Sequence, residues 1–139
     1  MIKQKSFSGS LKIMLCTLFL SACVSHTNYV PPQLPQGETR WFQVEEFEGN
    51  DIVQTSVLAV QGLHNGNTRW ILSDPFGVPQ ARMIATQNGW EKDGFAPPNR
   101  TAKRLFVRLF PLIEKSFRQP EIIEINQKQW RISIIETQI

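Results

Sequence analysis

Alternating apolar and polar positions, interrupted by turn residues, run through most of the chain after residue 38 and predict a β-rich domain. The clearest turn signals are the pairs Asn65-Gly66 and Asn88-Gly89 and the segment Asp74-Pro75-Phe76-Gly77. The strands expected from this pattern are residues 39–47, 52–60, 68–73, 80–86, a short one beginning near residue 90, 121–125 and 129–137.

One helix is expected before the last two strands. Apolar residues recur at helical spacing from Ala102 to Phe117, and Asn99 stands where it can cap the helix start. Pro111 is expected to kink the helix or end it near Phe110, because proline lacks a backbone N–H. Short links favour antiparallel neighbours. The predicted fold class is therefore α+β and β-rich, a curled antiparallel sheet with one main helix packed on its concave face.

The first 22 residues differ in pattern and are expected to be a secretory signal. Lysines at positions 3, 5 and 12 precede an almost unbroken apolar run over residues 13–22, which is the plan of such signals. The run is too short for a permanent span, which needs roughly 20 apolar residues. Three of the 15 basic side chains lie in this segment, which has no acid, so the rest balances 12 basic against 12 acidic side chains. This balance argues against a nucleic-acid partner.

The segment Leu20-Ser21-Ala22-Cys23 resembles the lipobox of bacterial lipoproteins. The resemblance implies cleavage before Cys23 and acylation of that residue, and two or more acyl chains anchor a protein stably. An ordinary secretory signal with a chance cysteine is the alternative. Val24 follows the cysteine, and the absence of Asp at that place resembles outer-membrane cargo, with the domain facing the periplasm.

Three segments follow from this interpretation. Residues 1–22 are the lipoprotein signal peptide, and residues 23–37 form the lipidated cysteine and a tether rich in proline. Residues 38–139 form the periplasmic domain. It contains no cysteine, so we expect neither a disulfide nor a cysteine-ligated metal in it.

The segments Arg69–Arg82, Gly89–Asn99 and Ala102–Phe106 resemble an uncharacterised family of small lipoproteins, often encoded beside aryl-polyene pigment genes. The match covers roughly residues 38–137. That family is distantly similar to the outer-membrane lipoprotein receptor LolB. The shared strand–turn–strand feature falls here on Leu72, Pro75, Phe76, Gly77 and Ala81. The resemblance implies an unclosed half-barrel with a hydrophobic concavity for acyl chains, and a loop with an exposed apolar residue, for which Leu63 is the nearest counterpart.

Seven apolar residues are the candidate lining of that concavity. The same side chains also suit a plain core, and Phe76 in particular suits a core plug at its turn. The candidates are Leu58, Trp70, Leu72, Phe76, Met83, Phe106 and Trp130.

The sequence favours binding over catalysis. His26 and His64 stand alone in the tether and in a turn, and no pair of residues has metal-ligand spacing. We therefore expect no catalytic residue, metal or cofactor. The predicted function is to bind a hydrophobic acyl or polyene-lipid ligand and aid its transfer to the outer membrane. The expected partners are that membrane, through acyl chains on Cys23, and a periplasmic carrier or envelope protein. The alternative is a structural lipoprotein that holds an envelope complex together without a small ligand.

Overall fold

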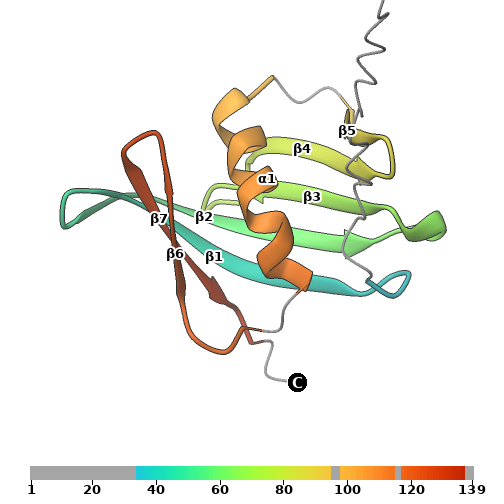
Figure 1. The fold of residues 1–139 in the computed structure, drawn as a ribbon, viewed down its shortest axis with the longest axis horizontal. Helices are drawn as coiled ribbons and strands as arrows, with labels where there is room; N and C mark the ends of the chain where they lie inside the picture. Colours follow the sequence, from blue (N-terminus) through green and yellow to red (C-terminus); the bar gives the residue numbers. More distant parts are fainter. Residues whose placement is uncertain (1–33, 95–97, 115–116, 137–139) are drawn as a thin grey trace, which may run out of the picture.

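Seven strands, one α-helix and a short 3₁₀ turn make up the fold in a computed structural model, which describes residues 34–94, 98–114 and 117–136 (Figure 1). The elements in chain order are β1 (Thr39–Glu48), β2 (Asp51–Gly62), the 3₁₀ turn η1 (His64–Gly66), β3 (Thr68–Ser73), β4 (Pro79–Thr86), β5 (Gly89–Lys92), α1 (Arg100–Glu114), β6 (Glu121–Ile125) and β7 (Lys128–Ile134).

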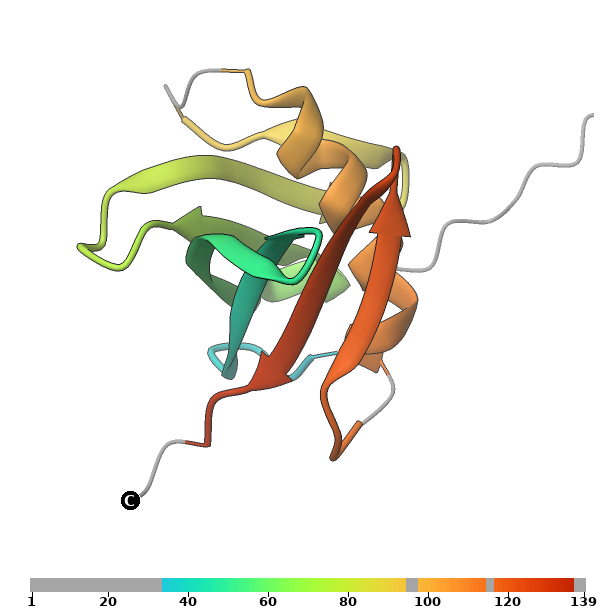
Figure 2. The ribbon, with the colours of Figure 1, turned by 90° about the vertical axis from the view of Figure 1, so that its left-hand side faces the viewer.

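All seven strands belong to one sheet, in the order β5-β4-β3-β2-β1-β7-β6, and every neighbouring pair is antiparallel. The first five strands are successive hairpin neighbours, and α1 then carries the chain to the opposite edge (Figure 1). The helix contacts both β4 and β6, which lie near opposite edges. The unclosed sheet therefore curls around the helix (Figure 2). The predicted β-rich α+β class, antiparallel sheet and single main helix are confirmed.

The core lies between the inner face of the sheet and the apolar side of α1. Trp70 is its centre, with 0% of its surface exposed. The Trp70 ring centroid lies 5.4 Å from that of Phe106 and 6.2 Å from that of Phe110, and 5.1 Å from that of Trp90 in an edge arrangement. The Trp70 Nε1 donates a 2.9 Å hydrogen bond to Thr68 Oγ1, so the indole nitrogen is satisfied inside the core.

The start of α1 is capped as predicted, and of the two expectations for Pro111, a kink or an end near Phe110, the structure contradicts the second. The Ala102 amide donates to Asn99 Oδ1 at 3.0 Å. Pro111 does not end the helix at Phe110, because α1 continues to Glu114. Pro111 and Val107 both lie on the exposed side of the helix. The proline nitrogen cannot donate a hydrogen bond to the Val107 carbonyl, and this carbonyl therefore has access to water.

Pro111→Ala is expected to stabilise the domain. Alanine restores the missing amide and removes the ring clash, which cost roughly 3 kcal/mol in a helix interior. Because position 111 is in the last turn, we expect a gain of about 1 kcal/mol. Urea unfolding of both proteins measures it, and Thr101→Ala, on the exposed first turn, is a control for a general gain in helix propensity. An unchanged or lower midpoint for Pro111→Ala contradicts the expectation.

The chain packs on the sheet before the first strand begins. Leu34, which sequence analysis assigned to the tether, is a buried member of the core. The Gly37 amide donates to the Gly62 carbonyl and the Gly62 amide donates to the Glu38 carbonyl, both at 2.9 Å. A β-carbon at Gly62 would lie 2.2 Å from the Pro35 carbonyl oxygen, so only glycine permits this approach.

Candidate functional site

Three of the predicted lining residues lie in a closed part of the core. Leu58, Trp70 and Phe106 are each 0% exposed. All three belong to the main apolar cluster of the core. The space between the centre of the sheet and α1 is therefore filled by side chains, as the core-packing alternative describes.

The Asp74–Gly77 turn forms as predicted, but its phenylalanine does not enter the core. Asp74 Oδ1 accepts hydrogen bonds from the amides of Phe76 and Val78, at 2.9 and 2.8 Å. The turn is closed by this carboxylate, and Phe76 points outward with 92% of its surface exposed. The expectation that Phe76 is a core plug or lines a cavity is thus wrong, because the turn that these hydrogen bonds close presents the Phe76 side chain to solvent.

The predicted apolar loop residue is also different from the one that the structure exposes. Leu63, beside η1, is half-buried, and its amide donates to the Asn67 carbonyl at 2.8 Å. Phe76 and Val78, at 92% and 58% exposed, are the apolar side chains that a turn presents to solvent.

An open cleft lies at one end of the curled sheet, beside the start of α1, and has a volume of about 430 Å³. Leu72 and Trp130, two of the predicted lining residues, contribute to its floor with Leu105. These three side chains are only 3–6% exposed, so the floor is apolar and continuous with the core. Its lining residues are Val44, Glu46, Gln54, Ser56, Leu72, Gln80, Asn99, Thr101, Ala102, Leu105, Lys128 and Trp130.

A hydrogen-bonded polar wall stands on one side of this cleft. Gln54 Nε2 donates to Ser56 Oγ at 3.3 Å and to Gln80 Oε1 at 3.2 Å. Ser56 Oγ donates to Gln80 Oε1 at 3.0 Å, and Asn99 Nδ2 donates to the Gln80 carbonyl at 3.4 Å. The wall therefore joins β2, β4 and the residue that caps α1, and it holds polar groups at fixed places above an apolar floor.

An ion pair stands on the other side of the cleft. Lys128 Nζ donates to Glu46 Oε1. That hydrogen bond, with the attraction of the same carboxylate, raises the pKa of Lys128 above its ordinary value of 10.5. The ammonium group is therefore charged at any physiological pH. The cleft thus has an apolar floor, a neutral wall and a wall that carries both signs of charge.

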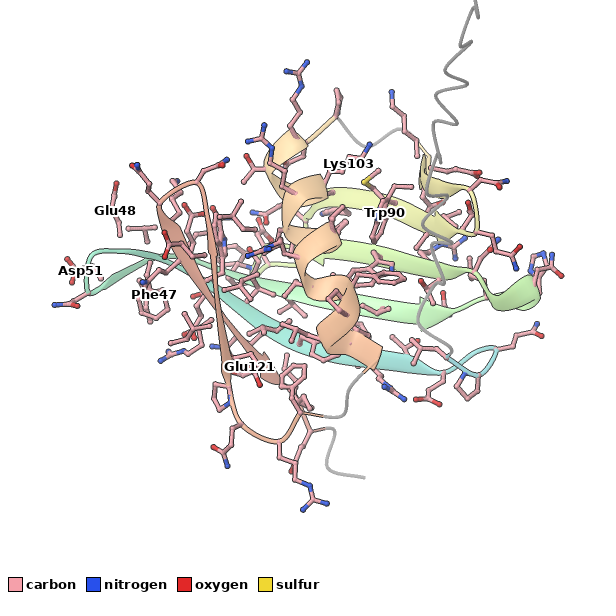
Figure 3. All side chains as sticks on the ribbon, in the orientation of Figure 1. Phe47, Glu48, Asp51, Trp90, Lys103 and Glu121 are labelled. Carbon is pink, nitrogen blue, oxygen red and sulfur yellow. The ribbon has the colours of Figure 1, made fainter. Side chains whose placement is uncertain are left out.

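Met83 lines a second, smaller depression. It has a volume of about 280 Å³ and includes Trp90 of β5 and Lys103 of α1. Figure 3 shows Trp90 and Lys103 at the upper half of α1 in that view. Of the predicted lining residues, the structure therefore places two in the larger cleft, one in the smaller depression, three in the closed core and one in solvent.

The polar wall was not predicted, although the sequence holds a signal for it. Gln54 and Ser56 share a strand face with Leu58 and Val60, so β2 changes from polar to apolar along one face. Such a change marks the place where an inward face leaves the core. The contact of Gln54 and Ser56 with Gln80 depends on the order of the strands in the sheet, and the alternating pattern of a strand does not predict that order.

Among residues 34–94, 98–114 and 117–136, no group of three or more histidine, cysteine, aspartate or glutamate side chains is placed to hold a metal ion. In the same ranges α1 is neither long nor apolar enough to cross a bilayer. Cys23, the predicted site of acylation, lies outside the described residues. Comparison of the chain with protein-family models, curated proteins and solved structures finds no match.

Proposed function

We propose that this protein is an outer-membrane lipoprotein, anchored through Cys23, whose periplasmic domain binds an amphiphilic acyl ligand and aids its transfer to the membrane. The observation that carries the proposal is the cleft of about 430 Å³ with its apolar floor and polar walls. The lipobox-like segment supports the anchor and the location. The closed core does not take part, so the ligand site is the open end of the sheet.

The cleft suits a ligand with an apolar tail and a polar end. Its volume lies in the range of about 300–1,000 Å³ that small-molecule sites have. Leu72, Leu105 and Trp130 offer the tail a small apolar patch, since each is only 3–6% exposed, and most of the surface inside the cleft is polar. The amide groups of Gln54 and Gln80 and the Lys128 ammonium can hold the polar end. The binding is noncovalent and reversible, so transfer follows a gradient of affinity from a carrier to the membrane.

Filling the cleft from its mouth is expected to weaken ligand binding strongly. Gln54 is exposed at the cleft wall, and Gln54→Trp puts an indole over the floor. A fluorescent 16-carbon fatty acid, titrated into the wild-type and variant proteins, measures the affinity. We expect at least a tenfold loss for Gln54→Trp, which corresponds to about 1.4 kcal/mol. Mass spectrometry of gently extracted wild-type protein is expected to show a bound acyl lipid.

Gln129→Trp is the matched control, since Gln129 is an exposed strand residue outside the cleft lining. It makes the same substitution without entering the cleft and is expected to keep the wild-type affinity. Equal affinities for all three proteins would contradict the proposed site. A wild-type protein that binds no fatty acid and carries no lipid would refute the ligand itself.

The filled core and the edge strand β6, which among the described residues pairs only with β7, support a second candidate, a structural lipoprotein that holds an envelope partner. β6 ends the sheet order, and its Ile122 is 66% exposed. An unpaired edge can receive another strand. Co-purification of a stable protein partner without any lipid, lost on Ile122→Lys, would favour this function.

A further inference from the structure

The outer face of α1 carries a cluster of four cations, which we call the basic face: Arg100, Lys103, Arg104 and Arg108. All four residues are exposed, and they recur at spacings of three and four, so they share one side of the helix. None of them takes part in an ion pair within the described ranges of the chain. The basic face is therefore a surface of one sign.

This arrangement costs the helix stability. Arg100, Arg104 and Arg108 are spaced by four residues, and like charges at that spacing repel each other. The first turn holds no acidic residue, although the helix N-terminus favours negative charge and disfavours cations. An anion above the basic face would relieve both costs, which is an electrostatic argument for an anionic partner.

The basic face also has an apolar floor. A shallow depression of about 400 Å³ is lined by the four cations together with Val107 and Ile125. Val107 is 46% exposed between Lys103 and Arg108. Long cationic side chains around exposed apolar groups are the pattern of surfaces that lie in the headgroup region of a bilayer, with stems on apolar surface and charges among phosphates. An acidic protein segment would use the charges but not this floor.

The anchor keeps such a surface close to a membrane. Eleven residue steps separate Cys23 from Leu34, the first described residue, and a chain of that length reaches at most about 40 Å. Confinement within this distance raises the effective concentration of headgroups, so a weak contact becomes populated. This step rests on the proposed acylation of Cys23, whereas the charge pattern does not.

We propose that the basic face of α1 docks on the anionic phospholipid headgroups of the membrane that holds the anchor. Docking fixes the orientation of the domain on the bilayer and leaves the turn with Phe76 and the outer face of the sheet free. The cleft lies beside the first turn of the same helix, so a docked domain holds its cleft near the headgroups.

Vesicle binding tests the proposal on the chain that follows the signal, residues 23–139, with Cys23→Ser so that no acyl chain contributes. Vesicles of phosphatidylcholine alone are compared with vesicles that also contain phosphatidylglycerol, at low and high salt. We expect sedimentation with the anionic vesicles only, and release by salt, because salt screens exposed charges. Arg104→Gln and Arg108→Gln are each expected to weaken binding about fivefold.

Arg118→Gln is the matched control, since it removes one exposed cation outside the basic face. We expect it to change binding less than twofold. An equal loss for Arg118→Gln and Arg108→Gln would overturn the proposal, because net charge alone would then account for binding. Absence of binding to anionic vesicles at low salt, where the exposed charges are least screened, would also overturn it, and so would binding to polyglutamate but not to vesicles.

A second measurement uses the acylated protein in proteoliposomes. Labelling of Lys103 by an amine-reactive reagent is expected to slow in anionic vesicles relative to neutral ones, while labelling of Lys128, on β7 and outside the basic face, changes less. Equal labelling of Lys103 in both would count against docking. Fatty-acid binding by Arg108→Gln and vesicle binding by Gln54→Trp are both expected to be normal. A result that contradicts ligand binding in the cleft can therefore be distinguished from one that contradicts membrane docking by the basic face.

Discussion

Trp70→Ala is expected to destabilise the domain by about 3–5 kcal/mol, the range for truncating a large buried aromatic side chain. The substitution removes a 0% exposed indole that contacts Trp90, Phe106 and Phe110. It also leaves Thr68 Oγ1, another 0% exposed group, without the Trp70 Nε1 donor. Because domains of this size have only about 5–15 kcal/mol of stability, the loss is a large share of the total.

Urea unfolding followed by tryptophan fluorescence and circular dichroism measures this effect, and the melting temperature is expected to fall by more than about 10 °C. Phe76→Ala is the control, since Phe76 is 92% exposed. It is expected to change stability by less than about 0.5 kcal/mol. A small effect for Trp70→Ala together with a large one for Phe76→Ala would mean that the turn, and not the helix–sheet contact, completes the core.

The sequence predicted the elements well because each one depends on local pattern. Strand β3 was placed at residues 68–73 and observed at Thr68–Ser73, where alternation alone separates Trp70 and Leu72 from Arg69 and Ile71. Asn99 was recognised as a helix cap from its place before an apolar run, and its side chain makes the predicted contact. Both features can be predicted from a few residues that are neighbours in the sequence.

The direction of a turn side chain and the approach of distant segments could not be predicted in this way. Hydrophobicity suggested a buried Phe76, but the two amides bound by Asp74 fix its direction. Proline content suggested that residues 34–37 belong to a free tether. The close approach of Pro35 to Gly62 joins residues far apart along the chain, and one glycine gives no sign of its partner.

In the candidate cleft, the sequence predicted residues of the floor but not residues of the walls. Leu72 and Trp130 were predicted because inward-facing apolar residues of a strand are visible in alternation. Gln80 and Lys128 were not, because a polar strand residue has the same pattern whether it faces bulk water or a cleft. Deciding between these two environments requires the sheet order and the position of α1, which come only from the folded chain.

Arg131→Met is expected to destabilise the domain at neutral pH. It is also expected to reverse the direction in which the titration of Glu45 changes the stability of the domain as the pH falls. Glu45 Oε2 accepts a 2.7 Å hydrogen bond from Arg131 Nε, and the Glu45 side chain is only 8% exposed. The Arg131 guanidinium also lies 5.1 Å from the ring centre of Phe47, which Figure 3 labels near the left end of the sheet. Removing one partner leaves a buried carboxylate without its counter-charge, and this is strongly destabilising.

The direction of the pH effect follows from the pKa of Glu45 in each protein. In the wild type the hydrogen bond from Arg131 lowers that pKa below 4.5, against the opposing effect of burial. Glu45 therefore contributes stability above pH 4.5, and the contribution is lost as the pH falls through its lowered value. Without Arg131, burial outweighs the hydrogen bond that remains from Gln43, so the pKa of Glu45 lies above its ordinary value. The variant then gains stability as the pH falls through that raised value towards 4.5.

Urea midpoints of both proteins between pH 4 and pH 8 measure this reversal, taken as the difference between variant and wild type so that other carboxylates cancel. The difference is expected to be largest near neutral pH and to shrink on acidification. The double variant Glu45→Gln/Arg131→Met should recover part of the stability and show no such pH dependence, because no buried charge remains. A difference that stays constant with pH, or the same dependence in the double variant, would show that Glu45 is not the titrating group and that Arg131 acts through Phe47 instead.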